Sequence, residues 1–387
     1  MAEWKHVKIG DVCTVERGGS PRPIDKFITD DPNGINWIKI GDTTDSMYIT
    51  ETAQKIIPEG MKKSRYVQPG DFLLSNSMSF GRPYILKIDG CIHDGWLVLR
   101  DNDGIFDKRF LYYYLSSPST YQKFKNMAVG GVVNNLNSEM VRGVTVPVPP
   151  MDEQIDIVTT LDKVTELIAL RKEQLAKLDQ VVKSHFVELF GHKGYPEDSL
   201  LNLCNVIDYR GKTPEKVENG LPFITAKNVR MHQMNLEPRE YISKETYDKV
   251  MVRGFPKEGD VVFTTEAPLG NVCRIPHFDT EFYIGQRIVT LQTEKLEPVY
   301  LEYALSSDDF KTKYMGKSSG STVTGIRVRL LEQLTIPVPP MELQEQFATF
   351  VEQTQKSKLA IQQSLDKLEL LKKSLMQEYF GQFKNCP

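Results

Sequence analysis

The sequence lacks most of the patterns that mark a catalytic or membrane-bound protein. Its five cysteines are scattered without CxxC spacing, which argues against a disulfide framework or a zinc ribbon and fits a reducing cytosol. No apolar run reaches membrane-spanning length, and the first residues contain no signal-like apolar stretch, so we expect a soluble, cytoplasmic protein. The six histidines show neither an HExxH motif nor a pair at metal-ligand spacing.

Motifs for cofactor chemistry are missing as well. The Gly-Lys-Thr tripeptide at 211–213 is similar to the end of a phosphate-binding loop, but Val206 stands where that loop requires a glycine. The Val-Pro-Pro-Met tetrapeptide at 148–151 lacks the leading Asn or Asp and the aromatic residue of an amino-methyltransferase motif. No carboxylate–lysine cluster of a nuclease is visible. The sequence therefore predicts a protein with no catalytic site, metal or cofactor of its own.

The charges are nearly balanced, with 48 basic and 51 acidic side chains. Proteins that bind DNA unaided gain much of their affinity by neutralising phosphates with an excess of lysine and arginine. This composition argues against a stand-alone DNA-binding protein, because the phosphate contacts would have to come from local patches or from a partner.

One strong internal repeat organises the chain. The hexapeptide Val-Pro-Val-Pro-Pro-Met at 146–151 returns as Ile-Pro-Val-Pro-Pro-Met at 336–341, an offset of 337 − 147 = 190 residues. Since proline cannot donate a ladder hydrogen bond, we expect an extended lead-in that stops a strand. A stretch without glycine or proline follows each copy, as far as Gly191 and Gly381, and predicts a helix roughly 57 Å long at 1.5 Å per residue.

Both stretches carry an apolar heptad stripe that polar residues interrupt in places, including His185. The first stripe consists of Leu161, Val164, Ile168, Leu175, Leu178, Val182 and Leu189, with Arg171 within it. The second consists of Ile361, Leu365, Leu368, Leu375 and Tyr379, with Lys358 and Lys372 within it. A helix with such a stripe needs a partner, so we predict an intramolecular antiparallel pair. The alternative is that each helix packs on its own neighbouring domain.

The segments before the two helices also repeat. The strand around Trp37 corresponds to the strand around Phe223, and the glycine-rich loop at 130–137 corresponds to the loop at 320–327. We therefore predict an α+β fold with two tandem mixed α/β domains, at 1–145 and 192–335, each followed by a long helical region, at 146–191 and 336–387. Turns and buried strands recur while polar residues differ. This pattern suits two copies of one scaffold that recognise different targets.

With these features the chain resembles the specificity subunits of type I restriction–modification systems. The likeness rests on Trp4–Asp11, on Arg-Gly-Gly-Ser-Pro at 17–21, on Pro-Val-Pro-Pro-Met-x-x-Gln at 147–154 and on its repeat at 337–344. It implies two target-recognition domains that each read half of a bipartite double-stranded DNA sequence. It also implies an antiparallel coiled coil that separates these domains and docks two modification subunits.

The resemblance further implies how the chemistry is divided among subunits. The modification subunits would carry S-adenosylmethionine and methylate adenine N6, and restriction subunits would add translocation and cleavage that depend on ATP and Mg. Whether a restriction subunit is present stays open. The alternative from another class is a duplicated coiled-coil scaffold that binds only proteins, and it predicts no sequence-selective DNA binding.

Polar side chains on turns and loops match the hydrogen-bonding groups of base edges and are the candidates for DNA contact. In the first domain these are Arg17, Arg22, Lys39, Ser79, Arg82, Asn134, Asn135 and Asn137. In the second they are Arg210, Lys212, Lys227, Asn228, Arg230, Asn271, Gln286, Arg287, Thr322, Thr324 and Arg327. Each could instead be a solvated or turn-capping residue, Asn137 and Asn228 above all.

Three further features each have a structural and a functional interpretation. We expect Trp37 and Trp96 to lie in the core rather than to stack on bases. We expect His93 to make local hydrogen bonds rather than to contact DNA. Gln154 and Gln344 occupy matching positions just inside the two helices. For these glutamines helix capping and partner docking both remain open.

Overall fold

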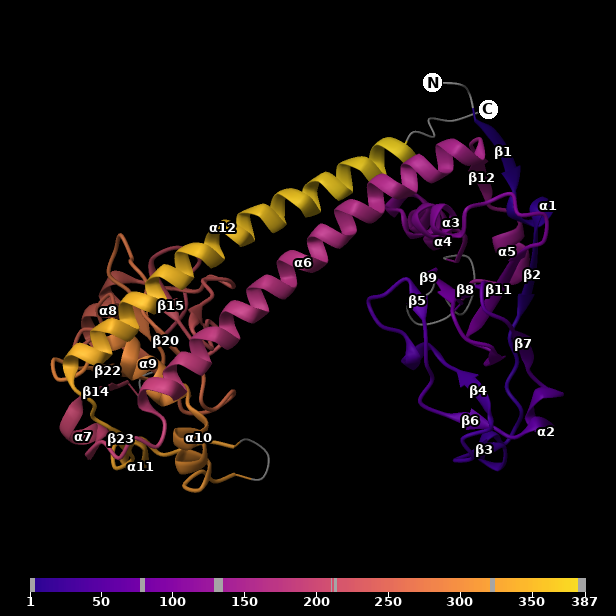
Figure 1. Ribbon diagram of the computed structural model, residues 1–387. Helices are drawn as coiled ribbons and strands as arrows, with labels where there is room; N and C mark the ends of the chain where they lie inside the picture. Colours follow the sequence, from indigo (N-terminus) through magenta and orange to yellow (C-terminus); the bar gives the residue numbers. More distant parts are fainter. Residues whose placement is uncertain are drawn as a thin grey trace. The chain divides into compact units, whose positions relative to one another are not determined.

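The computed structural model describes residues 4–76, 81–128, 135–209, 211, 214–320 and 324–381. It divides into two compact units (Figure 1). The first unit consists of residues Met1–Lys172 and Gln363–Pro387, and the second of Glu173–Gln362. Each unit therefore combines one of the two mixed α/β domains with parts of both long helices. None of the described helices is long and apolar enough to cross a membrane.

Among the described residues, the first unit contains two five-stranded sheets. One has the order β3 (Ile28–Thr29), β6 (Lys55–Ile56), β4 (Ile35–Ile38), β10 (Gly90–Ile92) and β7 (Arg65–Val67). The other has the order β2 (Cys13–Arg17), β11 (Trp96–Asp101), β8 (Phe72–Ser75), β9 (Pro83–Leu86) and β5 (Tyr48–Ile49). Strands β8 and β9 are buried along their whole length, which fits their mostly apolar sequences.

Short helices complete the first unit. They are α1 (Ile9–Val12), η1 (Ile24–Lys26), η2 (Ile40–Asp42), α2 (Pro58–Met61), α3 (Lys108–Ser116), α4 (Pro118–Ala128) and α5 (Ser138–Arg142). The side chain of Asp107 caps α3 by accepting from the backbone of Arg109 and Phe110. Helix α3 is rich in tyrosine, and its Phe110, Tyr113 and Tyr114 are buried.

The second unit repeats this plan with shorter sheets. One sheet has the order β14 (Asn205–Asp208), β22 (Ile288–Gln292), β19 (Val261–Thr264) and β20 (Val272–Arg274). Another has the order β18 (Tyr241–Ile242), β15 (Leu221–Ile224) and β21 (Tyr283–Ile284), and β16 (Val229–Arg230) pairs with β17 (Gln233–Met234). Its helices are α7 (Leu200–Leu203), α8 (Lys244–Val250), α9 (Pro298–Ser306), α10 (Asp308–Met315) and α11 (Val328–Leu331).

The duplication predicted from the sequence is confirmed. Helix α9 begins 298 − 108 = 190 residues after α3 begins. The two long helices, α6 (Met151–Phe190) and α12 (Met341–Phe380), have the same offset, 341 − 151 = 190. The parallel pair β4–β10 likewise has its counterpart in β15–β21. Two copies of one mixed α/β scaffold thus follow one another in the chain.

The proline-rich hexapeptide differs in one respect from the expectation. It does not simply stop a strand, because its first residues are part of one: β12 (Thr145–Val148) pairs with β1 (Lys5–Lys8), and β23 (Thr335–Pro337) pairs with β13 (Glu197–Ser199). Pro147 lies opposite His6 in this ladder. Both ladders have only two strands, so each is an edge, where a missing N–H is tolerated.

The long helices run antiparallel within each unit. In the first unit Leu161 shares a core with Met376 while Lys172 pairs with Glu369 further along, at 3.2 Å. In the second unit the His185 ring lies 4.5 Å from that of Phe350, and Lys358 pairs with Asp179 at 2.5 Å. The heptad residues named for this pair are all buried or half-buried: Leu161, Ile168, Leu175, Leu178, Ile361, Leu365, Leu368 and Leu375.

The C-terminal aromatic residue of each long helix completes the core of one unit. In the first unit Phe380 of α12 packs edge-on against Phe110 and Tyr114, with ring centroids 5.6 and 5.8 Å away. In the second unit Phe190 of α6 packs against Tyr300 at 4.8 Å and Phe347 at 5.6 Å. Both side chains are buried, so the last turn of a long helix helps to exclude water from the core of each unit.

Candidate nucleic-acid interface

Three separate segments of the first unit meet at Asn76, directly after β8. Its main-chain N–H donates to the carbonyl of Gly95 and its carbonyl accepts from the N–H of Leu136, both at 2.9 Å. The buried Asn76 side chain also donates to the carbonyl of Asp94 at 2.8 Å. We call residues 17–22, 76, 81–82, 93–95 and 135–137 the first loop cluster.

Thr265 has the same position in the second unit. Its N–H donates to the carbonyl of Arg287, and its carbonyl accepts from the N–H of Ile326, both at 2.9 Å. We call residues 265–266, 270–271, 285–287 and 324–327 the second loop cluster. Two independent stretches of sequence thus build the same main-chain junction.

The hairpin turn beside each junction is also shared. The N–H of Gly81 donates to the carbonyl of Ser75, and that of Gly270 to the carbonyl of Thr264. The next N–H, of Arg82 or Asn271, donates to the hydroxyl of the same Ser75 or Thr264. Both glycines have positive φ, of 78° and 90°, which a side chain would strain. These bonds fix the backbone from which residues 82 and 271 project.

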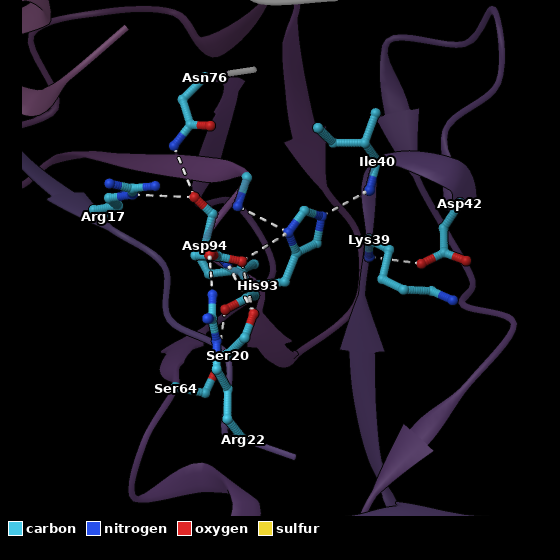
Figure 2. A network of polar contacts seen from close by, with 12 residues as sticks. Arg17, Ser20, Arg22, Lys39, Ile40, Asp42, Ser64, Asn76, His93 and Asp94 are labelled. Atoms are coloured by element: carbon cyan, nitrogen blue, oxygen red, sulfur yellow. Dashed lines mark hydrogen bonds and ion pairs between the residues drawn. The ribbon is translucent and has the colours of Figure 1, made fainter. Parts of the chain in front are cut away.

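Asp94 lies at the centre of the polar contacts of the first loop cluster (Figure 2). Its carboxylate accepts from the Ser20 hydroxyl at 2.8 Å and lies 3.6 Å from the Arg22 guanidinium. Its carbonyl accepts from Arg17 Nε at 3.1 Å as well as from Asn76. Two arginines named from the sequence are therefore brought together by an aspartate that sequence reasoning missed.

His93 has the local role that the sequence favoured. The N–H of Ile40 points to its Nε2 at 3.1 Å and the N–H of Gly95 to its Nδ1 at 2.8 Å (Figure 2). A neutral imidazole has one acceptor nitrogen, so the ring serves one donor at a time, and a protonated ring would serve neither. Burial lowers the pKa of His93. Trp37 and Trp96 are 2% and 0% exposed, so both belong to the core.

The remaining described candidates of the first domain differ in their exposure and in their hydrogen-bond partners. Arg82 is exposed, with its guanidinium 5.9 Å from the centre of the Tyr84 ring. Lys39 donates to Gln54 at 2.8 Å and lines an open hollow with Arg22 and Asp94. Asn135 is half-buried beside the junction. Asn137 caps α5 by accepting from the N–H of Met140 at 2.9 Å, which is the capping alternative.

In the second domain the structure brings Gln286, Arg287, Thr324 and Arg327 into the second loop cluster. Arg287 pairs with Glu266 at 3.1 Å. Arg327 stands before α11 without a side-chain capping bond, and its side chain is exposed like that of Thr324. The side chains just named come from three segments far apart in sequence, so only the fold makes them neighbours.

The other candidates of the second domain lie on or near the β16–β17 hairpin. Lys227 and Arg230 are exposed there. The Asn271 amide donates to the carbonyl of Val229 at 2.8 Å and so connects this hairpin to the second loop cluster.

Asn228 supports the structural alternative. It is 2% exposed, its side-chain oxygen accepts from the N–H of Thr225, and its amide donates to the carbonyl of Asn235, both at 2.9 Å. The prediction of DNA contact is therefore corrected for this residue, because DNA cannot reach a side chain that the turn encloses. Ser79, Asn134, Arg210, Lys212 and Thr322 lie outside the described residues.

Of the two roles left open for Gln154 and Gln344, helix capping and partner docking, docking is excluded. Both are 1% exposed, so a partner cannot reach their side chains. Gln154 accepts from the N–H of Asp107 at 2.9 Å and donates to the carbonyls of Ile105 and Pro149 at 3.0 Å. Gln344 repeats this by accepting from the N–H of Glu297 at 2.9 Å and donating to the carbonyl of Pro339 at 2.8 Å. Each glutamine joins the start of its long helix to the cap of α3 or α9.

Nothing in these clusters suggests metal chemistry. Within residues 4–76, 81–128, 135–209, 211, 214–320 and 324–381, no three His, Cys, Asp or Glu side chains approach one another as ligands would. The groups that the clusters present are arginines, amides, hydroxyls and carboxylates. These groups can donate to phosphates and exchange hydrogen bonds with base edges.

Fold and site together define a duplicated recognition scaffold in which each unit carries one polar loop cluster. The family model described as "Type I restriction modification DNA specificity domain" matches residues 1–180 and 196–371. The chain belongs to this family, the specificity subunits of type I restriction–modification systems.

Individual relatives are distant but cover most of the chain. The type I restriction enzyme MjaVIII specificity subunit of Methanocaldococcus jannaschii is 24% identical, over 89% of this chain and 84% of that protein. The EcoBI specificity subunit of Escherichia coli is 20% identical, over 90% of this chain and 79% of that protein.

Two solved structures share the fold. One comes from work on complex assembly and conformational transition of the type I R-M system, and it superposes with a TM-score of 0.62 at 21% identity, over 98% of both chains. The S subunit from M. genitalium superposes with a TM-score of 0.55 at 14% identity, over 97% of this chain and 95% of that one.

Proposed function

We propose that this chain reads a bipartite double-stranded DNA target, one half-site with each loop cluster. The observation that carries this proposal is the repeated junction at Asn76 and Thr265. The same main-chain bonds hold different polar side chains in the two units, such as Arg82 against Asn271. A scaffold that is kept while the polar side chains on it change is what two different DNA sequences require.

We also propose that the catalytic groups reside on partners. Modification subunits would bind to the chain, hold S-adenosylmethionine and methylate adenine N6 within the recognised site. Restriction subunits, where present, would supply the chemistry that requires ATP and Mg. The near-balance of 48 basic and 51 acidic side chains supports this division, because a partner would supply part of the phosphate contact.

The test is a methylome. Cells that carry this chain with its neighbouring modification subunit are compared with cells that lack the chain. We expect a bipartite N6-methyladenine motif that disappears with the chain. If a stable complex co-purifies but no motif depends on the chain, the proposal is wrong and the protein-binding scaffold takes its place.

The helix pair would set the gap between the two half-sites. Removal of one helical turn from α6, Glu173–Ala176, should change the number of unread base pairs in the motif or abolish methylation. An unchanged gap with full methylation would contradict this spacer role. Substitution of Glu173, Gln174 and Leu175 by alanine, next to the native Ala176, keeps the helix length and should leave the gap as it was.

A further inference from the structure

Asp94 in the first loop cluster and Gln286 in the second occupy equivalent backbone positions. Asn76 N–H bonds to Gly95 and Thr265 N–H bonds to Arg287, so Gly95 corresponds to Arg287. The strand registers agree, because Trp96 lies opposite Ser75 and Ile288 lies opposite Thr264. The residue before each of these carbonyls is Asp94 in the first unit and Gln286 in the second. An acid and an amide thus stand at one position of a shared backbone.

The backbone of Asp94 is held from several directions. Its carbonyl accepts from Arg17 and Asn76, and its N–H points to the Ser20 hydroxyl at 3.3 Å. Residues that recognise bases need this kind of fixed backbone, because a misplaced hydrogen bond discriminates poorly. Asp94 is therefore positioned before any ligand arrives.

Its carboxylate is nevertheless available to a ligand. The side chain is 42% exposed, and the nearest cation, Arg22, lies 3.6 Å away and is itself 83% exposed. The Ser20 hydroxyl, which donates to the carboxylate, lowers the pKa of Asp94, so the group is ionised at neutral pH. The carboxylate accepts from Ser20 at 2.8 Å, while Arg22 at 3.6 Å and His93 Nδ1 at 3.7 Å lie beyond hydrogen-bond distance. Since an ionised carboxylate has about four acceptor sites, this partly exposed group has room for a donor from a ligand.

A carboxylate among arginines that are proposed to face DNA needs a reason, because phosphates repel it. Base edges offer one. A carboxylate only accepts hydrogen bonds, and cytosine presents its N4 amino group as a donor in the major groove. Adenine places the N7 acceptor beside its amino group, which repels a carboxylate but suits the amide of a glutamine.

We propose that Asp94 and Gln286 are matched specificity-determining residues, with Asp94 selecting a cytosine in the first half-site and Gln286 an adenine in the second. This inference rests on the proposed function and names the contact through which it works. It assigns one base pair in each half-site to one backbone position of the duplicated scaffold.

A positioning role is the competing explanation for Asp94. In that case the carboxylate only orients Ser20 and Arg22, and its substitution would weaken binding to every site equally. Asp94→Asn separates the two, because asparagine keeps an oxygen for the Ser20 hydroxyl but adds an amide donor. A base-reading role changes the motif, whereas a positioning role changes only the extent of methylation.

The experiment is a methylome of cells with the modification subunit and the wild-type chain, Asp94→Asn or Gln286→Glu. For Asp94→Asn we expect the preference at one base pair of one half-site to move from cytosine toward adenine by about tenfold or more, with the other half-site unchanged. Gln286→Glu should move a position of the other half-site in the opposite direction. Asp103→Asn, an exposed acid outside the cluster, is the matched control and should leave the motif intact.

Every outcome decides the matter. A wild-type bipartite motif that both variants keep at all positions overturns the inference and leaves the proposed function standing. Absence of a bipartite motif in the wild type overturns both. If Asp94→Asn fails to accumulate, Gln286→Glu in the other unit gives the answer independently, since its shift or its lack is read in the second half-site.

Discussion

The two loop clusters have the same main-chain hydrogen bonds and different side chains. Asn76 and Thr265 each join a strand end, the turn before β11 or β22 and the segment before α5 or α11. Around them the first cluster gathers Arg17, Arg22 and Asp94, whereas the second gathers Arg287 and Glu266. The comparison teaches that the position of a side chain and its chemistry are specified separately. Main-chain hydrogen bonds determine where the side chain lies, whereas the residue type determines which hydrogen-bonding groups it presents.

The largest effect is expected where a long helix completes the core of a unit. Phe380→Ala and Phe190→Ala should each cost about 3–5 kcal/mol, because both remove a buried ring from an aromatic cluster. Chemical denaturation of the purified chain measures this free energy of unfolding. Leu370→Ala, at a side chain that is 68% exposed, is the control. A cost below about 1 kcal/mol at either phenylalanine would show that its unit is stable without the helix end.

The buried glutamines offer a graded comparison between the units. Gln154→Ala and Gln344→Ala should each cost about 1–3 kcal/mol, because buried backbone groups at Asp107 and Glu297 lose their partners. The first should cost more, since Gln154 makes one hydrogen bond more, to Ile105. The measurement is again the free energy of unfolding, with the exposed Gln353→Ala as control. Equal, negligible costs would mean that water replaces these bonds.

A smaller effect is expected at the junction itself. Asn76→Ala removes the bond from its amide to Asp94 but leaves the main-chain bonds, so the expected cost is about 1 kcal/mol. Thr265→Ala should cost less, because the hydroxyl lies 3.3 Å from the carbonyl of Arg287. In the methylome, Asn76→Ala should weaken discrimination in one half-site alone. Weakened discrimination in both would show that the clusters are not independent.

The smallest expected effect depends on pH and distinguishes the units, because Gly285 stands in the second cluster where His93 stands in the first. Burial lowers the pKa of His93 in the folded state below its ordinary 6.5. The unfolded chain therefore takes up the proton first, and the stability that neutral His93 supports is complete above pH 6.5 and is lost as the pH falls below it. Asp94, Asp42 and Lys39 face the ring and act on the same pKa, the two aspartates raising it and the lysine lowering it.

Hydrogen exchange measures this difference when the intrinsic rate is corrected for pH. Between pH 7.5 and 5.5, the segment around Ile40 and Gly95 should lose protection while the segment around Ile224 and Gly285 keeps it. His93→Gln, which retains an acceptor that does not titrate, should remove the pH dependence. Equal loss of protection in both segments would assign the effect to other groups.

Much of the fold was predictable because its signals are local. The hexapeptides, the heptad stripes and the 190-residue offset can be read without knowing any distant contact. The long helices begin at Met151 and Met341, one residue before the stretches that predicted them. The strand formed by Pro147 was not predictable, since it depends on pairing with His6 at an isolated edge.

The loop clusters were predictable only in part. Arg17, Arg22 and Arg287 were named from their turn context, but no motif marks Asp94, which becomes central because Ser20 and Asn76 are brought to it by the fold. The role of Gln154 was missed for the same reason, as its partner Asp107 lies 47 residues away. Polar residues on turns can be found from sequence, whereas their neighbours cannot.

The junctions at Asn76 and Thr265 have a consequence for how such a protein can change over generations. Their shared bonds use only peptide N–H and carbonyl groups, which every residue except proline provides. Side chains that project from the neighbouring loops can therefore be exchanged one at a time without unfolding the domain. If each loop cluster reads one half-site, as proposed, a lineage can acquire a new target preference in one half while the other half keeps the old one.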